Sequence, residues 1–301
     1  MNKWLKRIGL TVLGLAAFGT ATLLGAAHLG ERKMQRQIDL TLQPVALRGD
    51  AAAVERGRYL FASRGCADCH AANGAGHDVM KADNGMWIHA PNITPGPGGV
   101  VGAYTATDWV RTLRHGVKPS GRPLIVMPSE DYARLTDDDV AAVVAYVRQL
   151  PPAAGEAARI EFPLPVKALY AAGLVRDAAE KIDHALPPAQ PVPEGVTAAH
   201  GAYVANGCIG CHGATLSGGK VPGAPPDWPA AANLTPGEGS ALARYPSADA
   251  FMAMLRSGQR PDGSAVSPVM PFGSLKEMSD TDVRALYLHL KTLPARPAGQ
   301  H

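Results

Sequence analysis

The sequence predicts an all-α protein in which two repeated helical domains follow an N-terminal membrane-spanning helix. Three observations predict this fold class. Residues 8–27 form an uncharged apolar run, and the rest of the chain aligns with itself at an offset of 141–143 residues. Apolar residues also recur at helical spacing in both halves, whereas no alternating run is long enough to predict a sheet. A repeat period this long indicates duplicated domains.

The N-terminal segment begins MNKWLKR and continues without a charge from Ile8 to Ala27. Twenty helical residues span about 30 Å, the thickness of a hydrocarbon core. The leading basic residues stay on the cytoplasmic side, so the rest of the chain is expected in a bacterial periplasm. We therefore expect an inner-membrane anchor over residues 1–30. The alternative is a signal sequence cleaved at Gly25-Ala26-Ala27.

Each half then contains one Cys-x-x-Cys-His motif, and the two motifs use all four cysteines. This pattern is the attachment signal of c-type haem, in which two thioethers and a histidine ligand hold one macrocycle. A four-cysteine zinc site usually has a spacer of about 15–20 residues between its pairs, and structural disulfides are a further alternative. The sequence predicts two covalently bound haem c groups, held by Cys66, Cys69, His70, Cys208, Cys211 and His212.

The repeat places a first domain over residues 50–151 and a second over residues 195–297. Each domain ends in a helix with a capping residue, Thr136 or Ser279, followed by apolar residues at i, i+3, i+4 and i+7. The linker, residues 152–194, reads as a structured strap with one helical stretch near Lys167–Ile182. The other expected helices are Ala52–Ser63, Thr107–Arg114, Ala198–Asn206 and Ser247–Arg256.

The sixth iron ligands are predicted to be Met127 and Met270. They lie 57 and 58 residues after their histidines, and each precedes a proline. A thioether raises the reduction potential of the iron. A single methionine often only fills a gap in a core, but the matched positions favour ligands. The competing ligands His77, His89 and His115 have no histidine counterpart in the second half; for His115 a supporting or surface position is expected.

Two further matched sets are candidates for contacts with the haem propionates. The repeated Asn-x-Thr-Pro loops could donate hydrogen bonds from Asn92, Thr94, Asn233 and Thr235, or could simply form turns before proline. Arg114 and Arg256 are the better propionate partners, because a guanidinium pairs well with a carboxylate.

These features resemble the cytochrome c subunits of bacterial membrane-associated dehydrogenases, which include partners of alcohol, gluconate and aldehyde dehydrogenases. The resemblance covers roughly residues 50–297. It implies a class I cytochrome c fold for each domain and a role as an electron conduit. Well-known members have three haem domains, whereas this chain has two motifs. The segments that carry the resemblance are Arg56-Gly-Arg-Tyr-Leu60, Gly201-Ala-Tyr-Val204, the two Asn-x-Thr-Pro loops, the two Val-Met-Pro loops and Phe162–Lys167 with Leu169-Tyr170.

The expected function is electron transfer from a periplasmic dehydrogenase to an oxidase, a soluble cytochrome or the quinone pool, without catalysis by the chain itself. The net charge of +3 and the absence of a basic run beyond the N-terminus argue against a nucleic-acid partner. One alternative is a haem-relay subunit of a terminal oxidase complex. A dihaem peroxidase would need an open distal site, and the two matched methionines argue against one. A thiosulfate-oxidising cytochrome would need an unusual distal ligand such as cysteine, but the two motifs use all four cysteines.

Overall fold

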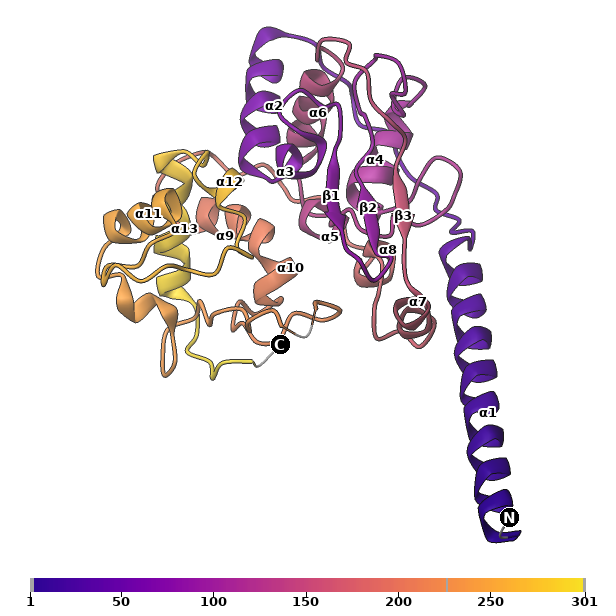
Figure 1. Cartoon of the computed structure of the whole chain (residues 1–301). Coiled ribbons are helices and arrows are strands. Elements are labelled where there is room, and N and C mark those ends of the chain that lie inside the picture. Colours follow the sequence, from indigo (N-terminus) through magenta and orange to yellow (C-terminus); the bar gives the residue numbers. More distant parts are fainter. Residues whose placement is uncertain (1–2, 226, 300–301) are drawn as a thin grey trace.

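Two helical domains lie side by side, and one long helix projects away from them (Figure 1). The computed structural model describes residues 3–225 and 227–299. The projecting helix is α1 (Lys3–Met34), and an extended segment connects it to the first domain. The predominantly helical architecture and the N-terminal apolar helix confirm the predicted fold class.

The first domain is built around helices that begin at good capping residues. Asp50, Thr105 and Thr136 each accept a hydrogen bond from a backbone amide of the first turn that follows, as expected for N-cap side chains. The helices of this domain are α2 (Ala51–Ser63), α3 (Cys66–His70), α4 (Ala106–His115), α5 (Ser129–Tyr132) and α6 (Asp137–Val147).

The second domain repeats this order. Thr197, Ser247 and Ser279 are its capping residues, so the predicted caps at Thr136 and Ser279 are confirmed. Its helices are α9 (Ala198–Ala205), η1 (Asn206–Cys208), α10 (Ile209–His212), η2 (Ala241–Arg244), α11 (Ala248–Ser257), α12 (Phe272–Leu275) and α13 (Asp280–Thr292).

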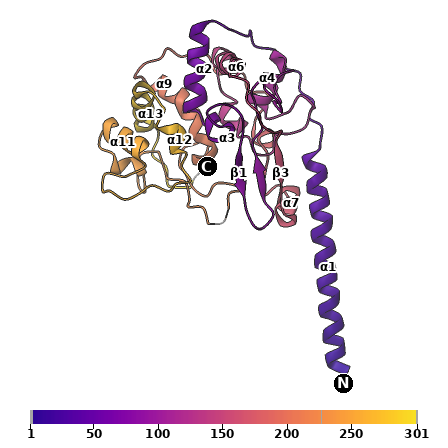
Figure 2. The same ribbon diagram turned by 45° about the horizontal axis from the view of Figure 1, so that its top comes forward.

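The first and last helices of each domain cross at very close range, α2 on α6 and α9 on α13 (Figure 2). A glycine makes each crossing possible. A Cβ atom on Gly57 would lie 1.9 Å from the carbonyl oxygen of Ala142, and one on Gly201 would lie 1.9 Å from that of Ala285. Since real Cβ atoms do not approach backbone so closely, only glycine permits this packing.

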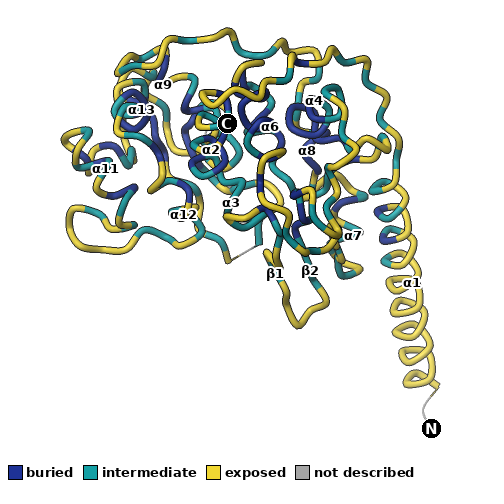
Figure 3. The backbone as a smooth tube through the Cα atoms, turned by 90° about the horizontal axis from the view of Figure 1, so that it is seen from above, coloured by how far each residue is buried: buried dark blue, intermediate teal, exposed yellow. Residues whose placement is uncertain are grey.

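Each domain has its own apolar core, centred on its last helix. The helical faces expected from the sequence are buried, with Val140 and Val144 of α6 at 0% and 1% exposure and Val283 and Leu290 of α13 at 0%. The buried segments of the two domains are visible along these helices in Figure 3. The two cores are separate clusters, and one cysteine of each motif packs against the core of its own half.

The linker differs from the expected single helical stretch. It contains a short strand, β3 (Arg159–Glu161), and then two short helices, α7 (Leu164–Ala171) and α8 (Ala178–Lys181). A turn with Gly173 at φ +75° separates the helices. A left-handed residue of this kind ends a helix.

A small antiparallel sheet, ordered β1-β2-β3, also corrects the expectation that no sheet would form. Its other strands are β1 (Asp78–Lys81) and β2 (Trp87–His89), and Ile88 pairs with Ile160 of the linker. The Trp87 ring lies between Lys81 and Arg159, whose cationic groups are 3.9 and 3.7 Å from its centre. Strands of three or four residues carry too little periodicity to be found from sequence.

Candidate haem sites

The two Cys-x-x-Cys-His motifs occupy equivalent short helices that follow the first helix of each domain. Cys66, Cys69 and His70 lie on α3, whereas Cys208 ends η1 and both Cys211 and His212 lie on α10. In each domain the motif forms a separate short turn after the first helix and does not continue it. After this break the first cysteine of each motif, Cys66 or Cys208, packs against the core of its own domain.

Both histidines are held by one backbone hydrogen bond on the Nδ1 side of the ring. His70 Nδ1 lies 2.9 Å from the carbonyl oxygen of Pro91, and His212 Nδ1 lies 2.8 Å from that of Ala232. A carbonyl oxygen only accepts, so Nδ1 carries the proton and Nε2 keeps its lone pair. Burial lowers the pKa of both imidazoles, which favours this neutral form. This is the usual arrangement of a metal-binding histidine.

Those carbonyl groups belong to the residues just before the two Asn-x-Thr-Pro loops. Asn92 accepts a hydrogen bond from the amide of Thr94 and donates to the carbonyls of Pro97 and Ala153, at 2.8, 3.1 and 2.8 Å. Asn233 makes the matching bonds to Thr235 and to Arg296. All four side chains are buried and engaged within the protein, so the turn interpretation is the one the structure supports. The loops therefore hold in place the Pro91 and Ala232 carbonyls that contact the proximal histidines.

The predicted distal methionines lie in matching loops that contact the same cores as the cysteines. Met127 and Cys66 pack against the core of the first domain, and Met270 and Cys208 pack against that of the second. Each loop is closed by a hydrogen bond from the amide two residues later to the methionine carbonyl, 2.8 Å in both cases. The structure thus brings one candidate methionine and one motif to each core.

The donor set fits a covalently bound haem. The four cysteines are unpaired, and burial raises the pKa of both Cys66 and Cys208 to about 12. Neutral thiols beside apolar side chains suit the edge of a porphyrin better than they suit a metal cation. Among the residues described, no cluster of three or more His, Cys, Asp or Glu side chains is placed to hold a metal ion by itself.

Arg114 and Arg256, the predicted propionate partners, are both engaged with nearby groups of the protein. Arg114 donates to the carbonyl of Leu135 at 2.6 and 3.1 Å and forms an ion pair with Asp137 at 2.7 Å. Arg256 donates to the carbonyl of Met278 and forms an ion pair with Asp280. Each guanidinium therefore fixes the chain just before the last helix of its domain.

The competing histidines are engaged elsewhere. His77 lies within hydrogen-bond distance of the carbonyls of Asp68 and Asp78, and His89 binds the Asp78 carboxylate at 2.7 Å. His115 is buried, not on the surface, and its Nδ1 lies 3.0 Å from Nδ1 of His184. Burial and the neighbouring His184 lower the pKa of His115 to about 4.

The distal loop of each domain also contacts the haem motif of the other domain. Asp131, which follows Met127 by four residues, accepts a hydrogen bond at 3.0 Å from the amide of Gly210 inside the second motif. Ser274, which follows Met270 by four residues, donates to the carboxylate of Asp68 inside the first motif. Both motifs therefore lie at the interface between the domains, each in contact with the distal loop of the other domain. Burial, together with the neighbouring Glu130, raises the pKa of Asp131 to about 7.

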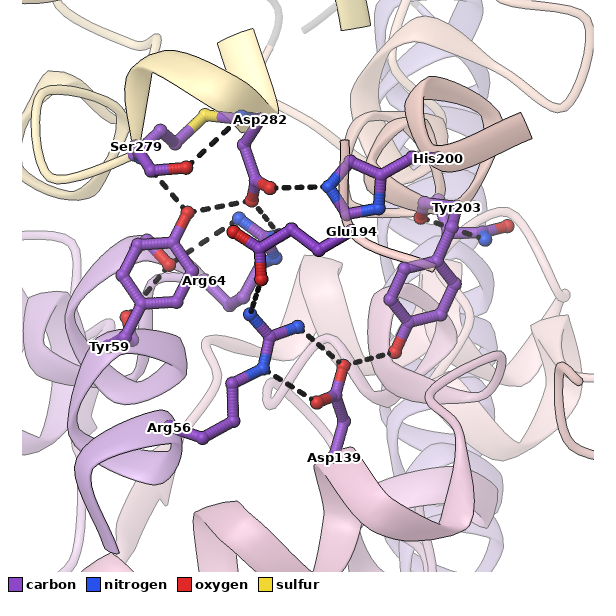
Figure 4. Close-up of polar contacts among 12 residues, drawn as sticks. Arg56, Tyr59, Arg64, Asp139, Glu194, His200, Tyr203, Ser279 and Asp282 are labelled. Atoms are coloured by element: carbon purple, nitrogen blue, oxygen red, sulfur yellow. Dashed lines mark hydrogen bonds and ion pairs between the residues drawn. The ribbon is translucent and has the colours of Figure 1, made fainter. Parts of the chain in front are cut away.

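A second exchange of contacts, between tyrosines and helix N-termini, crosses the same interface (Figure 4). Tyr59 of α2 donates to Asp282 at 2.6 Å and accepts from the amide of Ser279, the cap of α13, at 3.0 Å. Tyr203 of α9 donates to Asp139 at 2.5 Å and accepts from the amide of Thr136, the cap of α6, at 3.2 Å. Each tyrosine thus completes the start of a helix in the other domain.

Each of the two aspartates at this interface also binds one arginine, and Asp282 has a histidine partner in addition. Asp139 receives two bonds from Arg56 at 2.8 and 3.0 Å. The Asp282 carboxylate accepts a hydrogen bond from Arg64 at 2.6 Å and lies 2.7 Å from Nε2 of His200. Burial alone would raise the pKa of Asp282, but Arg64 and the hydrogen bonds around the carboxylate outweigh it and hold the pKa below its usual value. Arg64 lies two residues before Cys66, so this buried ion pair joins the first motif to α13.

Comparison with known proteins agrees with this architecture. The family model of cytochrome c matches residues 54–151 and 196–294, one segment for each motif. The chain therefore belongs to the cytochrome c family, and this family implies covalently bound haem c with its iron.

Several curated relatives are cytochrome subunits of dehydrogenases. The chain is 32% identical over 283 residues to the cytochrome c subunit of a quinone alcohol dehydrogenase of Gluconobacter oxydans. It is 31% identical over 291 residues to the gluconate 2-dehydrogenase cytochrome c subunit of Pantoea cypripedii. These alignments cover 84% and 86% of the chain but only 57% and 64% of the relatives. A diheme cytochrome of Cereibacter sphaeroides is 33% identical over 132 residues.

Proposed function

We propose that the chain is a membrane-anchored dihaem cytochrome that carries electrons away from a periplasmic dehydrogenase. The observation that carries this proposal is that both motifs lie at the interface between the domains, where Asp131 contacts Gly210 and Ser274 contacts Asp68. Two haems fixed on either side of such an interface form a short path for electrons. The similarity to dehydrogenase cytochrome subunits supports the choice of donor.

Each domain, residues 50–151 and 195–297, would hold one haem. In the first, Cys66 and Cys69 form the thioethers, and His70 and Met127 bind the iron. In the second, Cys208 and Cys211 form the thioethers, and His212 and Met270 bind the iron. A bound haem c supplies a one-electron ferric–ferrous couple.

The residues around the iron would set the potential and keep its geometry constant. The Pro91 and Ala232 carbonyls fix the imidazole orientation and strengthen each histidine as a ligand. The methionine loops are tied to the interface through Asp131 and Ser274, so distal ligand and neighbouring motif are held together. In this role the chain binds no organic substrate and catalyses no reaction on one.

The apolar helix α1 would anchor the chain in the bacterial inner membrane, with the haem domains in the periplasm. It is long and apolar enough to cross a membrane, and none of its most apolar window is buried against the protein. Lys3, Lys6 and Arg7 precede the apolar run and favour a cytoplasmic N-terminus. The acceptor would be an oxidase, a soluble cytochrome or the quinone pool.

A potentiometric titration of the full-length haem-loaded protein tests the ligand assignment. Met127→His should keep both covalent haems but lower the potential of one centre, because imidazole favours ferric iron more than a thioether does. Met270→His should lower the other centre. Met86→His, a methionine of the β1–β2 hairpin, is the matched control and should change neither.

If Met127→His left both potentials unchanged, Met127 would not be a ligand. Equal shifts of both centres would contradict the assignment of one methionine to each domain. A high-spin centre in the unaltered protein would show that a distal methionine is missing, and a peroxidase-type enzyme would then become the better reading.

A further inference from the structure

The periplasmic end of α1 is clamped by the linker instead of leading into a free tether. Lys33 donates to the Tyr170 carbonyl at 2.9 Å and forms an ion pair with Glu180 at 2.8 Å. Just beyond the helix, Arg36 makes two bonds to Asp177 at 2.7 and 3.0 Å. The last turns of α1 are therefore fixed to α7 and α8.

The backbones of α1 and α7 approach closely at one glycine. A Cβ on Gly30 would lie 2.1 Å from the carbonyl oxygen of Lys167, and Ala27 one turn earlier is 3% exposed. Figure 3 shows α1 exposed along its length except where these last turns meet α7. The linker helix is thus held against the exact end of the apolar run, which closes at Ala27.

This contact places α7 at the level of the membrane surface. If residues 8–27 fill the hydrocarbon core, Gly30 lies only about 4.5 Å beyond it along the helix axis. The headgroup layer on each side is about 5–7 Å thick. A helix packed on Ala27 and Gly30 therefore lies within that layer, next to lipid.

The outer side of α7 is apolar where it would meet the lipid. Leu164 and Leu169 of α7 and Leu174 in the following turn are 44%, 43% and 65% exposed. From Leu164 to Val175 the only charged side chain is Lys167, and its ammonium pairs with Glu31 of α1 at 2.5 Å. The flanking Arg32 and Arg176 are exposed and suit lipid phosphates.

We propose that residues 164–174, here called the membrane foot, insert into the periplasmic leaflet beside α1. An apolar surface rimmed by basic side chains is the composition of an interfacial membrane segment. With α1 and the foot both in the bilayer, the haem domains are held against the membrane in one orientation. This inference rests on the proposed anchoring role of α1.

Single-cysteine variants of the full-length haem-loaded protein in lipid nanodiscs test the foot. The native cysteines are consumed by haem attachment, so the introduced thiol alone reacts with a membrane-impermeant maleimide. Leu174→Cys and Leu169→Cys should react at least about tenfold more slowly than Leu288→Cys, which lies on α13 at 39% exposure. Leu13→Cys in the middle of α1 should be fully protected. A diazirine-bearing lipid should crosslink to the peptide that contains residues 164–174.

The outcomes separate the foot from the anchor. If Leu13→Cys is protected but Leu174→Cys reacts like Leu288→Cys, the anchor stands and the foot is wrong. If Leu13→Cys itself reacts freely, the anchoring role fails and the foot fails with it. Protection of Leu174→Cys without any lipid crosslink would mean that another protein surface covers the segment, which also overturns the proposal.

Discussion

The exchange of tyrosines between the domains leads to an asymmetric prediction. Tyr59→Phe removes a hydroxyl that donates to the buried carboxylate of Asp282 and accepts from the amide of Ser279. The altered residue belongs to the first domain, but both lost partners belong to the second. The substitution should therefore weaken the N-terminus of α13 and leave α6 unaffected.

The magnitude follows from the kind of bond that is lost. A hydrogen bond to a charged group contributes about 1.5–3 kcal/mol, and its partner is left buried without a replacement. Asp282 keeps Arg64 and His200, so the loss should stay near 2 kcal/mol and the ion pair should persist. Because 1.4 kcal/mol corresponds to a factor of ten, local opening of α13 should become about 30-fold more frequent.

Hydrogen exchange read by mass spectrometry on the haem-loaded protein measures this opening locally. Amides of residues 279–283 should exchange about 30-fold faster in Tyr59→Phe, with residues 136–140 unchanged. Tyr203→Phe should show the reverse pattern, through Asp139 and Thr136. Tyr146→Phe is the matched control, because its hydroxyl has no hydrogen-bond partner among the described residues.

The reasoning would be refuted if Tyr59→Phe accelerated exchange only within the first domain. It would also be refuted if Tyr59→Phe matched Tyr146→Phe at residues 279–283. Either result would mean that the tyrosine hydroxyl does not support the helix of the other domain.

Two further predictions concern acid stability and haem loading. The lowered pKa of Asp282 contributes stability that is fully present above the ordinary aspartate pKa of about 3.9 and is lost as the pH falls through the lower folded pKa. The melting temperature of the unaltered protein should therefore fall as the pH is lowered below about 4. Asp282→Asn should have a lower melting temperature at neutral pH and a smaller further decrease in acid. If both proteins lost the same amount of stability in acid, Asp282 would not have this role. Cys208→Ala combined with Cys211→Ala should halve the haem content, measured by absorbance, and leave the first domain folded. Complete loss of the protein would show instead that the domains depend on each other to fold.

The sequence was sufficient wherever the deciding interactions are local. A Cys-x-x-Cys-His motif places its thiols and imidazole within two helical turns, so the thioether positions and the proximal ligand are encoded in five residues. The caps at Thr136 and Ser279 act on amides three residues away, and the core faces of α6 and α13 follow from helical periodicity. The apolar helix α1 could also be predicted, because its apolar residues are consecutive in the sequence.

Tertiary structure decided everything that depends on residues far apart in the chain. The repeat puts Tyr59 and Tyr203 at equivalent positions, but only the packing of the domains sends each hydroxyl across to the other. The matched arginines Arg114 and Arg256 are candidates for propionate contacts in the sequence, and only the fold shows that each also binds a backbone carbonyl and a carboxylate at the start of the last helix. β3 pairs with β2, which lies about seventy residues earlier in the chain. Such contacts arise from the juxtaposition of separate elements, which no local pattern of residues records.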